Sequence, residues 1–350
     1  MSRVKDITIY DLARRLHISI PTLTRAPKDG PVVSKKTKKK IFGPAEEMGY
    51  RSNLFARNLR NQRTDTIGVI VPMLNSYFQS TVIAGIERVI NREGYNLIIT
   101  QSDENPLKEI AGAKTMFNNR VDGLLVSLSY DTDDLSHFEQ FSKKNIPVIF
   151  FDRGEEHESF TNVLIDNRRA AYEATTHLIS QGCRRILHIT ATSKRDLYIE
   201  RINGFKQALL ENELPFDENS LLYSNLSHEE GTNAADLILR MDPMPDAVFV
   251  SNDNYAAGCL LALKKAGLRI PEDIAIVGFN NDPVSKVVEP NLTTINNPGF
   301  EIGEMAANSL INHLKGLSPI TATNTIMLRS ELIIRASSLK SGVFKKAAVV

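Results

Sequence analysis

The feature that most constrains this chain is a regular alternation of short apolar runs and longer amphipathic stretches. It extends from residue 66 to about residue 335. Short runs rich in Val, Ile and Leu suit parallel strands that helices cover on both faces, and the amphipathic stretches suit the covering helices. The alternation therefore predicts an α/β fold built on parallel sheets. The predicted strands span residues 67–71, 96–100, 123–126, 147–151, 162–165, 186–189, 247–250 and 274–278.

The length of the chain indicates more than one domain. At 350 residues and 42% hydrophobic content, it exceeds what a single core usually organises. A polar stretch at residues 61–65 precedes the first predicted strand, and the last residues carry three lysines without a clear pattern. We therefore divide the chain into residues 1–50, a linker at 51–65, a large domain at 66–338, and a tail at 339–350 that can be disordered.

The net charge of +1 conceals a strong division along the chain. Residues 1–63 hold 15 Lys and Arg against 5 Asp and Glu, whereas the remaining residues hold 27 against 36. A basic end on an acidic body suits binding to a polyanion through counterion release, because the acidic body is repelled by the same polyanion. From the charge alone, a solvated basic tail is the alternative.

Several classes of protein are disfavoured by what the sequence lacks. There is no run of about eighteen apolar residues and no charged leader followed by an apolar segment, which predicts a cytoplasmic protein without a membrane span. Cys183 and Cys259 lie in apolar stretches without metal-ligand spacing, so we expect reduced core residues. Because no G-x-G-x-x-G, P-loop, nucleophile elbow or metal-ligand cluster is present, we expect neither an enzyme nor a cofactor.

The basic end contains the pattern of a helix, a tight turn and a second helix. Apolar residues at positions 9, 12, 13 and 16 fall on one helical face behind Thr8, which suits a helix N-cap. A turn at His17 follows, and Ser19 can cap a second helix that extends to residue 26. Pro21 is tolerated there because it falls in the first turn. The pattern predicts a helix-turn-helix.

Residues 8–25 resemble the head of the lactose/galactose repressor family, which reads roughly T-I-x-D-V-A-x-x-A-G-V-S-x-x-T-V-S-R. The resemblance continues through residues 31–34, 45–50, 53–60 and 66–69. It implies a bacterial transcription repressor whose second helix lies in the major groove of a double-stranded DNA operator. Residues 53–60 match the family's hinge helix, whose leucine enters the minor groove.

The resemblance implies DNA contacts in both of these segments. Ile20, Pro21 and Arg25 face base edges. Arg25 can pair with guanine, whereas the other two offer only apolar contact to thymine methyl groups. Leu59 is either the minor-groove wedge or an ordinary packing residue, and each lysine between residues 35 and 40 is as readily a solvated side chain as a specific contact. The predicted DNA-binding residues are Thr8, Ser19, Ile20, Pro21, Thr22, Thr24, Arg25, Ser34, Asn53, Ala56 and Leu59.

The head departs from the family pattern at three positions. His17 stands where the family has a turn glycine, and a left-handed backbone there is modestly unfavourable for histidine. Pro27 replaces the usual Leu and can end the second helix at Ala26. Pro44 interrupts the third helix expected from Lys35, at a cost of about 3 kcal/mol. Either that helix begins late, at Pro44, or the head is weakened.

The rest of the chain resembles the family's sensor, which shares the two-lobed fold of periplasmic sugar-binding proteins. Several of the residues that carry the likeness follow predicted strands, as at positions 75–78, 151–153, 251–253 and 277–281. Ligands of open α/β sheets bind at such carboxyl ends. The resemblance therefore implies a small-molecule effector, of the sugar class, in a cleft between the lobes.

A sugar requires carboxylate, amide and guanidinium groups for its hydroxyls and an aromatic ring for its apolar face. The implied effector-binding residues are Tyr77, Phe78, Ser127, Asp152, Arg195, Arg201, Asn252 and Asn280, the first two by stacking. Position 280 is commonly Asp in the family, so the Asn leaves the ligand's identity open. Asp253 is interpreted as a residue that stabilises a helix N-terminus.

Two functions from different classes follow. The first is a homodimeric repressor that binds a palindromic operator and is controlled by an effector through the spacing of its heads. The second is a carbohydrate-binding receptor whose head no longer binds DNA because of Pro27 and Pro44. We expect the first, since the basic head, the hinge segment and the cleft residues agree on it.

Overall fold

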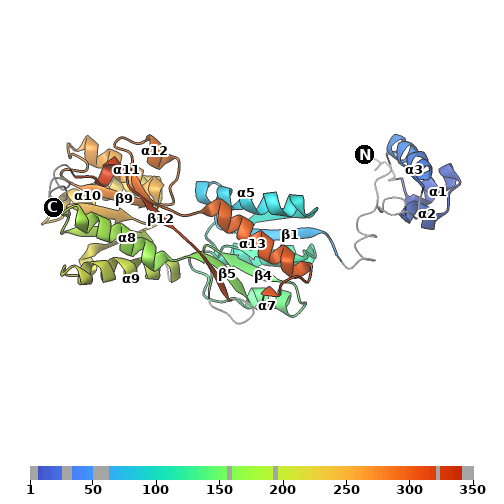
Figure 1. Cartoon of the computed structure of the whole chain (residues 1–350), viewed down its shortest axis with the longest axis horizontal. Helices are drawn as coiled ribbons and strands as arrows, with labels where there is room; N and C mark the ends of the chain where they lie inside the picture. The colour runs from blue at the N-terminus through green and yellow to red at the C-terminus, as the bar shows by residue number, and fades with distance from the viewer. Residues whose placement is uncertain are drawn as a thin grey trace, which may run out of the picture. The chain divides into compact units, whose positions relative to one another are not determined.

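The computed structural model describes residues 7–25, 34–49, 63–155, 160–191, 196–320 and 324–340. The chain divides into two compact units, Met1–Thr64 and Asp65–Val350, which are drawn in Figure 1. Within the described residues, no helix combines the length and the apolar character that crossing a membrane requires.

The small unit contains three described helices around a miniature core. They are α1 (Ile9–Leu16), α2 (Ile20–Arg25) and α3 (Lys35–Glu47). Each contributes to one apolar cluster: Leu12 from α1, Leu23 from α2, and Ile41 and Ala45 from α3. Burying each large aliphatic side chain contributes about 1.5–3 kcal/mol, so this core is small beside those of the large unit.

The predicted helix-turn-helix is present, and its first helix has a capping residue at each end. Thr8 and Asp11 form a capping box, in which the Asp11 N–H donates to the Thr8 hydroxyl at 3.3 Å and the Thr8 N–H donates to the Asp11 carboxylate at 3.0 Å. His17 ends α1 in the left-handed conformation, with φ 50° and ψ 40°. The sequence thus places a non-glycine residue at a position that favours glycine.

The third helix does not begin at Pro44, which corrects one of the two alternatives for this segment. A single helix runs from Lys35 to Glu47 with Pro44 inside it. Proline lacks the N–H group that would bond to the carbonyl one turn earlier, so α3 loses one hydrogen bond. The helix continues beyond it, since the N–H of Met48 donates to the Pro44 carbonyl at 3.0 Å.

The large unit contains two six-stranded sheets, each the centre of one lobe. The first sheet has the order β11-β5-β4-β3-β1-β2 and is parallel throughout. The second has the order β12-β10-β9-β8-β6-β7, with only β12 antiparallel. The strands of the first are β1 (Thr66–Val71), β2 (Asn96–Gln101), β3 (Gly123–Val126), β4 (Val148–Phe151), β5 (Thr161–Ile165) and β11 (Thr325–Leu328). Those of the second are β6 (Ile186–Ala191), β7 (Leu221–Ser224), β8 (Ala247–Val250), β9 (Ala275–Phe279), β10 (Thr293–Asn296) and β12 (Glu331–Ile333).

Helices cover both sheets, as the continuous apolar strands require. The first lobe has α5 (Tyr77–Arg92), α6 (Pro106–Asn118), α7 (Ser136–Ser142) and α13 (Gly299–Leu314). The second has α8 (Asn167–Ser180), α9 (Asp196–Glu211), α10 (His228–Arg240), α11 (Asp253–Lys265) and α12 (Val284–Val287). The helices α5 and α13 lie side by side (Figure 1). They approach so closely that a Cβ atom on Gly303 would stand 2.1 Å from the Val82 carbonyl oxygen.

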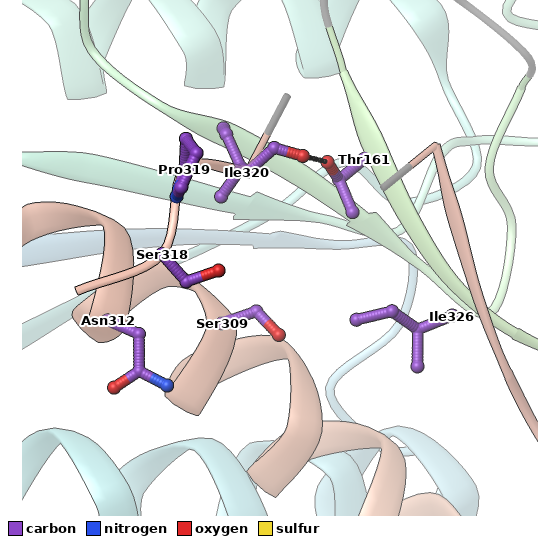
Figure 2. A pocket seen from close by; sticks show the side chains of 7 residues that line it. All are labelled: Thr161, Ser309, Asn312, Ser318, Pro319, Ile320 and Ile326. Atoms are coloured by element: carbon purple, nitrogen blue, oxygen red, sulfur yellow. Dashed lines mark hydrogen bonds between the residues drawn. The ribbon is translucent and has the colours of Figure 1, made fainter. Parts of the chain in front are cut away.

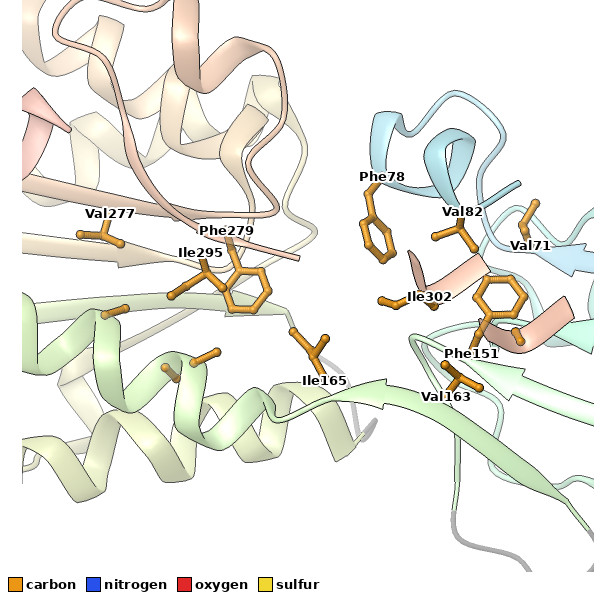
Figure 3. Packing of buried hydrophobic residues seen from close by; sticks show 14 of the residues in the cluster. Val71, Phe78, Val82, Phe151, Val163, Ile165, Val277, Phe279, Ile295 and Ile302 are labelled. Carbon is orange, nitrogen blue, oxygen red and sulfur yellow. The ribbon is translucent and has the colours of Figure 1, made fainter. Parts of the chain in front are cut away.

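The chain passes between the lobes three times, through residues 166, 297–298 and 329–330. These crossings follow the carboxyl ends of β5, β10 and β11. One apolar cluster contains residues of both lobes, and Figure 3 shows Phe279 and Ile295 of the second sheet on one side and Phe78 and Val82 of α5 on the other. The carboxyl ends of the two sheets therefore lie at the junction of the lobes.

Candidate functional site

The first lobe contributes a linked group of polar side chains to the junction. Ser127 follows β3, Asp152 follows β4, and Gln79 lies in the first turn of α5. The Gln79 amide nitrogen donates to the Asp152 carboxylate at 3.2 Å and to the Ser127 hydroxyl at 3.4 Å. The Asp152 backbone is left-handed, with φ 60°. Because Gln79 is 3% exposed and Ser127 is fully buried, this group faces the interior of the junction.

The second lobe contributes Arg201, a buried guanidinium in α9. Its Nε donates to the Asn167 side-chain oxygen at 2.9 Å, and its Nη1 donates to the Ser251 carbonyl at 3.2 Å. The guanidinium carbon lies 3.5 Å from the centre of the Phe279 ring. Burial lowers the pKa of Arg201 to about 10, so the side chain stays a cation at neutral pH.

The crossing residue Asn297 joins the two groups. Its amide nitrogen donates to the Asn280 side-chain oxygen at 3.4 Å, and its side chain is also hydrogen-bonded to Asp152. Asn280 has φ 109°, which few residues other than glycine adopt. Backbone strain of this kind is concentrated at functional sites. A residue of the crossing therefore bridges Asp152 of the first lobe and Asn280 of the second.

Asp152 is the carboxylate at the centre of this network. Its side chain is 12% exposed, and burial raises its pKa, while the positive charges of Arg153 and Arg201 lower it. Arg153 lies 3.9 Å away, and Arg201 acts across the junction. The site thus combines one carboxylate, amides, a hydroxyl and a cation, which is the chemistry that binds hydroxyl groups.

A pair of tyrosines connects the lobes beside this network. The Tyr198 hydroxyl, from α9, donates to the Tyr130 hydroxyl of the first lobe at 3.2 Å, and their ring centres are 5.6 Å apart. Arg153 lies over the Tyr130 ring at 4.2 Å and is bound to Glu104 at 2.7 Å. Tyr130 also packs against the apolar cluster of the second lobe, so the pair joins the lobes by apolar packing as well as by a hydrogen bond.

Two hollows in the described part of the large unit lie at opposite ends of β5. One, of about 140 Å³, opens beside Asp152 and is continuous with the first crossing. Its lining residues are Asp152, Gly154, Leu164, Ile165, Asp166, Asn167, Arg168, Asp196, Leu197, Glu200 and Met327. The other, of about 90 Å³, lies at the opposite end of β5, where Thr161, Ser309 and Asn312 line it (Figure 2). Of these two, the first adjoins the polar network.

The predicted effector-binding residues fall into three groups. Ser127, Asp152, Arg201 and Asn280 belong to the network described above. Tyr77, Phe78 and Asn252 make other contacts: Tyr77 is 48% exposed, Phe78 is buried in the apolar cluster, and the Asn252 oxygen caps α11 by accepting from the Tyr255 N–H. Arg195 lies outside the described residues.

Sequence reasoning missed Gln79, Tyr130, Tyr198 and Asn297. Gln79 could have been found, since it occupies the apolar face of α5 with Val82 and Ile86, where a polar side chain requires a buried partner. Asn297 carries no sequence signal, because its importance comes from its place in a crossing between lobes.

The predicted DNA-binding residues of the small unit lie around its helix starts. Thr8 and Ser19 are exposed caps, Pro21 is exposed in the first turn of α2, and Ile20 and Thr22 are partly buried. The Ser19 and Thr22 hydroxyls are 2.9 Å apart. Thr24 and Arg25 belong to α2, and Ser34 precedes α3 and is exposed. Pro27, Asn53, Ala56 and Leu59 lie outside the described residues.

Metal and thiol chemistry find no support in the described residues. No group of three or more His, Cys, Asp and Glu side chains there is arranged to hold a metal ion. Cys183 and Cys259 are free and fully buried, as predicted. Burial raises the pKa of both thiols, that of Cys259 to about 12, which disfavours the reactive thiolate.

Residues 175–338 match the model of the periplasmic binding protein-like domain. Catabolite control protein A of Priestia megaterium is 32% identical over 310 residues, which cover 88% of this chain and 93% of that protein. The chain belongs to the LacI/GalR family of transcriptional regulators. The predicted family, the two-lobed α/β sensor and the helix-turn-helix head are thereby confirmed.

Solved LacI/GalR structures agree with the fold. The transcriptional regulator CelR in complex with cellobiose is 25% identical, with a TM-score of 0.72, over 95% of this chain and 99% of that one. The lac repressor dimer bound to operator and an anti-inducer has a TM-score of 0.84 over 96% of this chain and 100% of that one, at 22% identity. The second likeness supports the fold alone.

Proposed function

We propose that this regulator binds a palindromic operator as a dimer, and that a small carbohydrate between its lobes controls the binding. The observation that carries the proposal is the polar network at the junction. It joins Gln79 and Asp152 of one lobe to Asn280 of the other and faces the buried cation of Arg201. CelR, a member of the same family, was solved with cellobiose, which supports the carbohydrate class.

The charge of the small unit and the geometry of its helices support the proposal that it binds operator DNA. Residues 1–63 carry 15 basic against 5 acidic side chains, and α1 and α2 form the helix-turn-helix. A helix of this motif enters the major groove, and phosphate contacts around it supply much of the affinity. Because Ile20 and Pro21 cannot donate hydrogen bonds from their side chains, we expect specificity to depend on Arg25 and on DNA shape.

An exposed sheet edge supports the proposal that the protein forms a dimer. Among the described strands, β2 pairs with β1 alone, and α6 packs against it. Apolar side chains are exposed on both elements: Ile99 at 36%, Leu107 at 75% and Ile110 at 43%. An uncovered edge strand beside exposed apolar side chains is a surface that a second copy can cover.

Coupling between the effector site and the DNA-binding head follows from the three crossings between the lobes. An effector that bridges Asp152 and Asn280 binds one separation of the lobes more tightly than another, and it thereby shifts the equilibrium between them. If the spacing of the two heads follows the lobes, operator affinity changes by the same coupling free energy.

The direct test starts from a randomised DNA duplex library. The full chain should enrich a two-fold symmetric site, and sedimentation should show a dimer at that site. Cellobiose or glucose should then shift the operator affinity by at least fivefold. Failure to enrich any duplex refutes the DNA proposal, whereas a stable operator complex that no carbohydrate changes refutes only the carbohydrate proposal.

Pro44 favours a second candidate, a carbohydrate receptor whose head is too unstable to bind DNA. The two candidates separate with Pro44→Ala, which restores one helical hydrogen bond and stabilises α3 by up to about 3 kcal/mol. If the head is functional, wild type and variant enrich the same duplex. If the head is impaired, only the variant binds DNA while both bind carbohydrate.

A further inference from the structure

Gln79 is a buried polar residue on the apolar stripe of α5, and it lines the junction between the lobes. It is 3% exposed and shares the stripe with Phe78, Val82 and Ile86. Its two hydrogen bonds, at 3.2 and 3.4 Å, are long for an amide donor. Its side-chain oxygen is buried and has no hydrogen-bond partner in the described residues.

We propose that Gln79 selects the effector, by accepting a hydrogen bond from a neutral polyhydroxy ligand at a point where an anionic group is rejected. This inference rests on the proposed function, since it concerns the same cleft.

The orientation of the amide follows from Asp152. A carboxylate only accepts hydrogen bonds, so the Gln79 nitrogen faces Asp152 and the Gln79 oxygen faces away from it. An acceptor that is buried without a donor is costly, and native structures rarely retain one. A ligand hydroxyl at this position supplies the missing donor, whereas a ligand carboxylate or phosphate brings a second acceptor and a charge that Asp152 repels.

Asn297 repeats the pattern across the junction. It is 5% exposed, its nitrogen donates to Asn280, and its oxygen has no partner in the described residues. The Gln79 and Asn297 side-chain oxygens are thus two buried acceptors without donors in the described residues. The Arg201 guanidinium offers N–H donors to a ligand oxygen. Hydroxyl groups both donate and accept, so a neutral sugar fits this set at all three points.

The test measures binding by calorimetry on the full chain with matched neutral and acidic probes: glucose with glucuronate, and cellobiose with cellobionate. Wild type should bind the neutral member at least tenfold more tightly than its acid. Gln79→Ala should weaken the neutral probe by about threefold to tenfold, the usual effect of one hydrogen bond. The matched control is Gln181→Ala, because Gln181 is also buried, at 6%, but caps α8 in the second lobe.

Gln79→Glu adds a pH readout that a purely structural role would not produce. At pH 7.5 the new carboxylate faces Asp152, so binding of the neutral probe should fall more than tenfold. At pH 5.5 the carboxyl group becomes protonated, since a neighbouring like charge raises its pKa. It then has both a donor and an acceptor, and most of the affinity should return. Gln181→Glu should show no such recovery.

The outcomes separate the two proposals. Tighter binding of an acid than of its neutral parent overturns the inference and leaves a carbohydrate effector standing. Equal binding by wild type and both Gln79 variants, with folding verified by circular dichroism, also overturns the inference alone. Failure of all four probes to bind wild type counts against the carbohydrate function itself and, with it, this inference.

Discussion

The two lobes differ in how they accommodate buried charge. In the first lobe, Glu109 is fully buried and accepts hydrogen bonds from the Ser129 N–H at 2.7 Å, the Thr132 hydroxyl at 3.1 Å and His137 at 3.0 Å. Arg153, likewise, is bound to a carboxylate, that of Glu104. Ionic groups of this lobe thus have partners of opposite charge or several donors.

The second lobe gives Arg201 and His188 neutral hydrogen-bond partners and places two buried carboxyl groups, Asp253 and Asp282, close together. Arg201 donates to an amide oxygen and a carbonyl, and His188 uses one ring nitrogen for the Phe249 carbonyl while the other has no described partner. Burial raises the pKa of Asp253 to about 6, and burial together with Asp253 raises that of Asp282 to about 7. Burial lowers the pKa of His188 to about 3.

This difference indicates which lobe responds to pH. A buried ionic group with a partner of opposite charge keeps its charge over a wide pH range, whereas burial without such a partner shifts the pKa toward the neutral form. The second lobe therefore couples protons to folding near neutral pH. Asp253 and Asp282 directly follow Asn252 and Asn281, so this coupling adjoins the loops that carry Asn252 and Asn280.

Removing Arg201 should produce the largest effect. Arg201→Ala leaves the Asn167 oxygen and the Ser251 carbonyl without their donor and opens a cavity on Phe279. We expect the free energy of unfolding to fall by about 3 kcal/mol and carbohydrate binding to be lost. Denaturant unfolding measures the first and calorimetry the second. Arg185→Ala, at an arginine that is 54% exposed, is the control and should change either quantity little.

Glu109→Gln tests the first lobe at a buried carboxylate that accepts three hydrogen bonds. The amide nitrogen of Gln would face groups that donate to the carboxylate, so at least one of them loses its acceptor. We expect a loss of about 2 kcal/mol and faster hydrogen exchange in residues 129–137. Glu139→Gln, on the exposed face of α7, is the matched control. Unchanged hydrogen exchange in residues 129–137 would show that the Glu109 carboxylate does not stabilise that segment.

The pH dependence of stability should come from the second lobe. The folded pKa of Asp282, about 7, lies above its ordinary value of 3.8. Its contribution is therefore fully present below about pH 4 and is lost as pH rises through 7. Asp282→Asn should remove this loss and gain about 2 kcal/mol relative to wild type between pH 5 and pH 8, as measured by urea unfolding at each pH.

His188 opposes this trend at the acidic end. Its folded pKa of about 3 lies below the ordinary value of 6.5, so its contribution is present above pH 6.5 and is lost as pH falls toward 3. Wild type should therefore be most stable between the folded pKa of His188, about 3, and that of Asp282, about 7. If Asp282→Asn and wild type had parallel pH profiles, Asp282 would not titrate in this range and the contrast between the lobes would fail for it.

The sequence predicted the fold well because burial on both faces leaves a strong pattern. All eight predicted strands are present, since each is a continuous apolar run. The missed strands, β7, β10, β11 and β12, have three or four residues each, and all but β10 are largely half-exposed. Short, partly exposed strands at or near sheet edges are set by their neighbours rather than by their own pattern.

The site was predictable where residues follow strands and unpredictable where lobes meet. Asp152 and Asn280 were expected from the family resemblance, and both lie just after predicted strands. Asn297, Tyr130 and Tyr198 depend on how two separately folded sheets are joined, which no local pattern encodes. Their contacts required the three crossings to be known.

The tyrosine pair should give the smallest effect, and it tests whether this one hydrogen bond couples the lobes. Tyr198→Phe and Tyr130→Phe each remove one hydroxyl from the contact at 3.2 Å, while the rings still pack. Each change should cost about 1 kcal/mol in the free energy of unfolding, and a double-mutant cycle should give a coupling of about 0.5–1 kcal/mol, because one hydrogen bond is lost only once. Additive effects would mean that the two hydroxyls act independently and that their hydrogen bond does not couple the lobes.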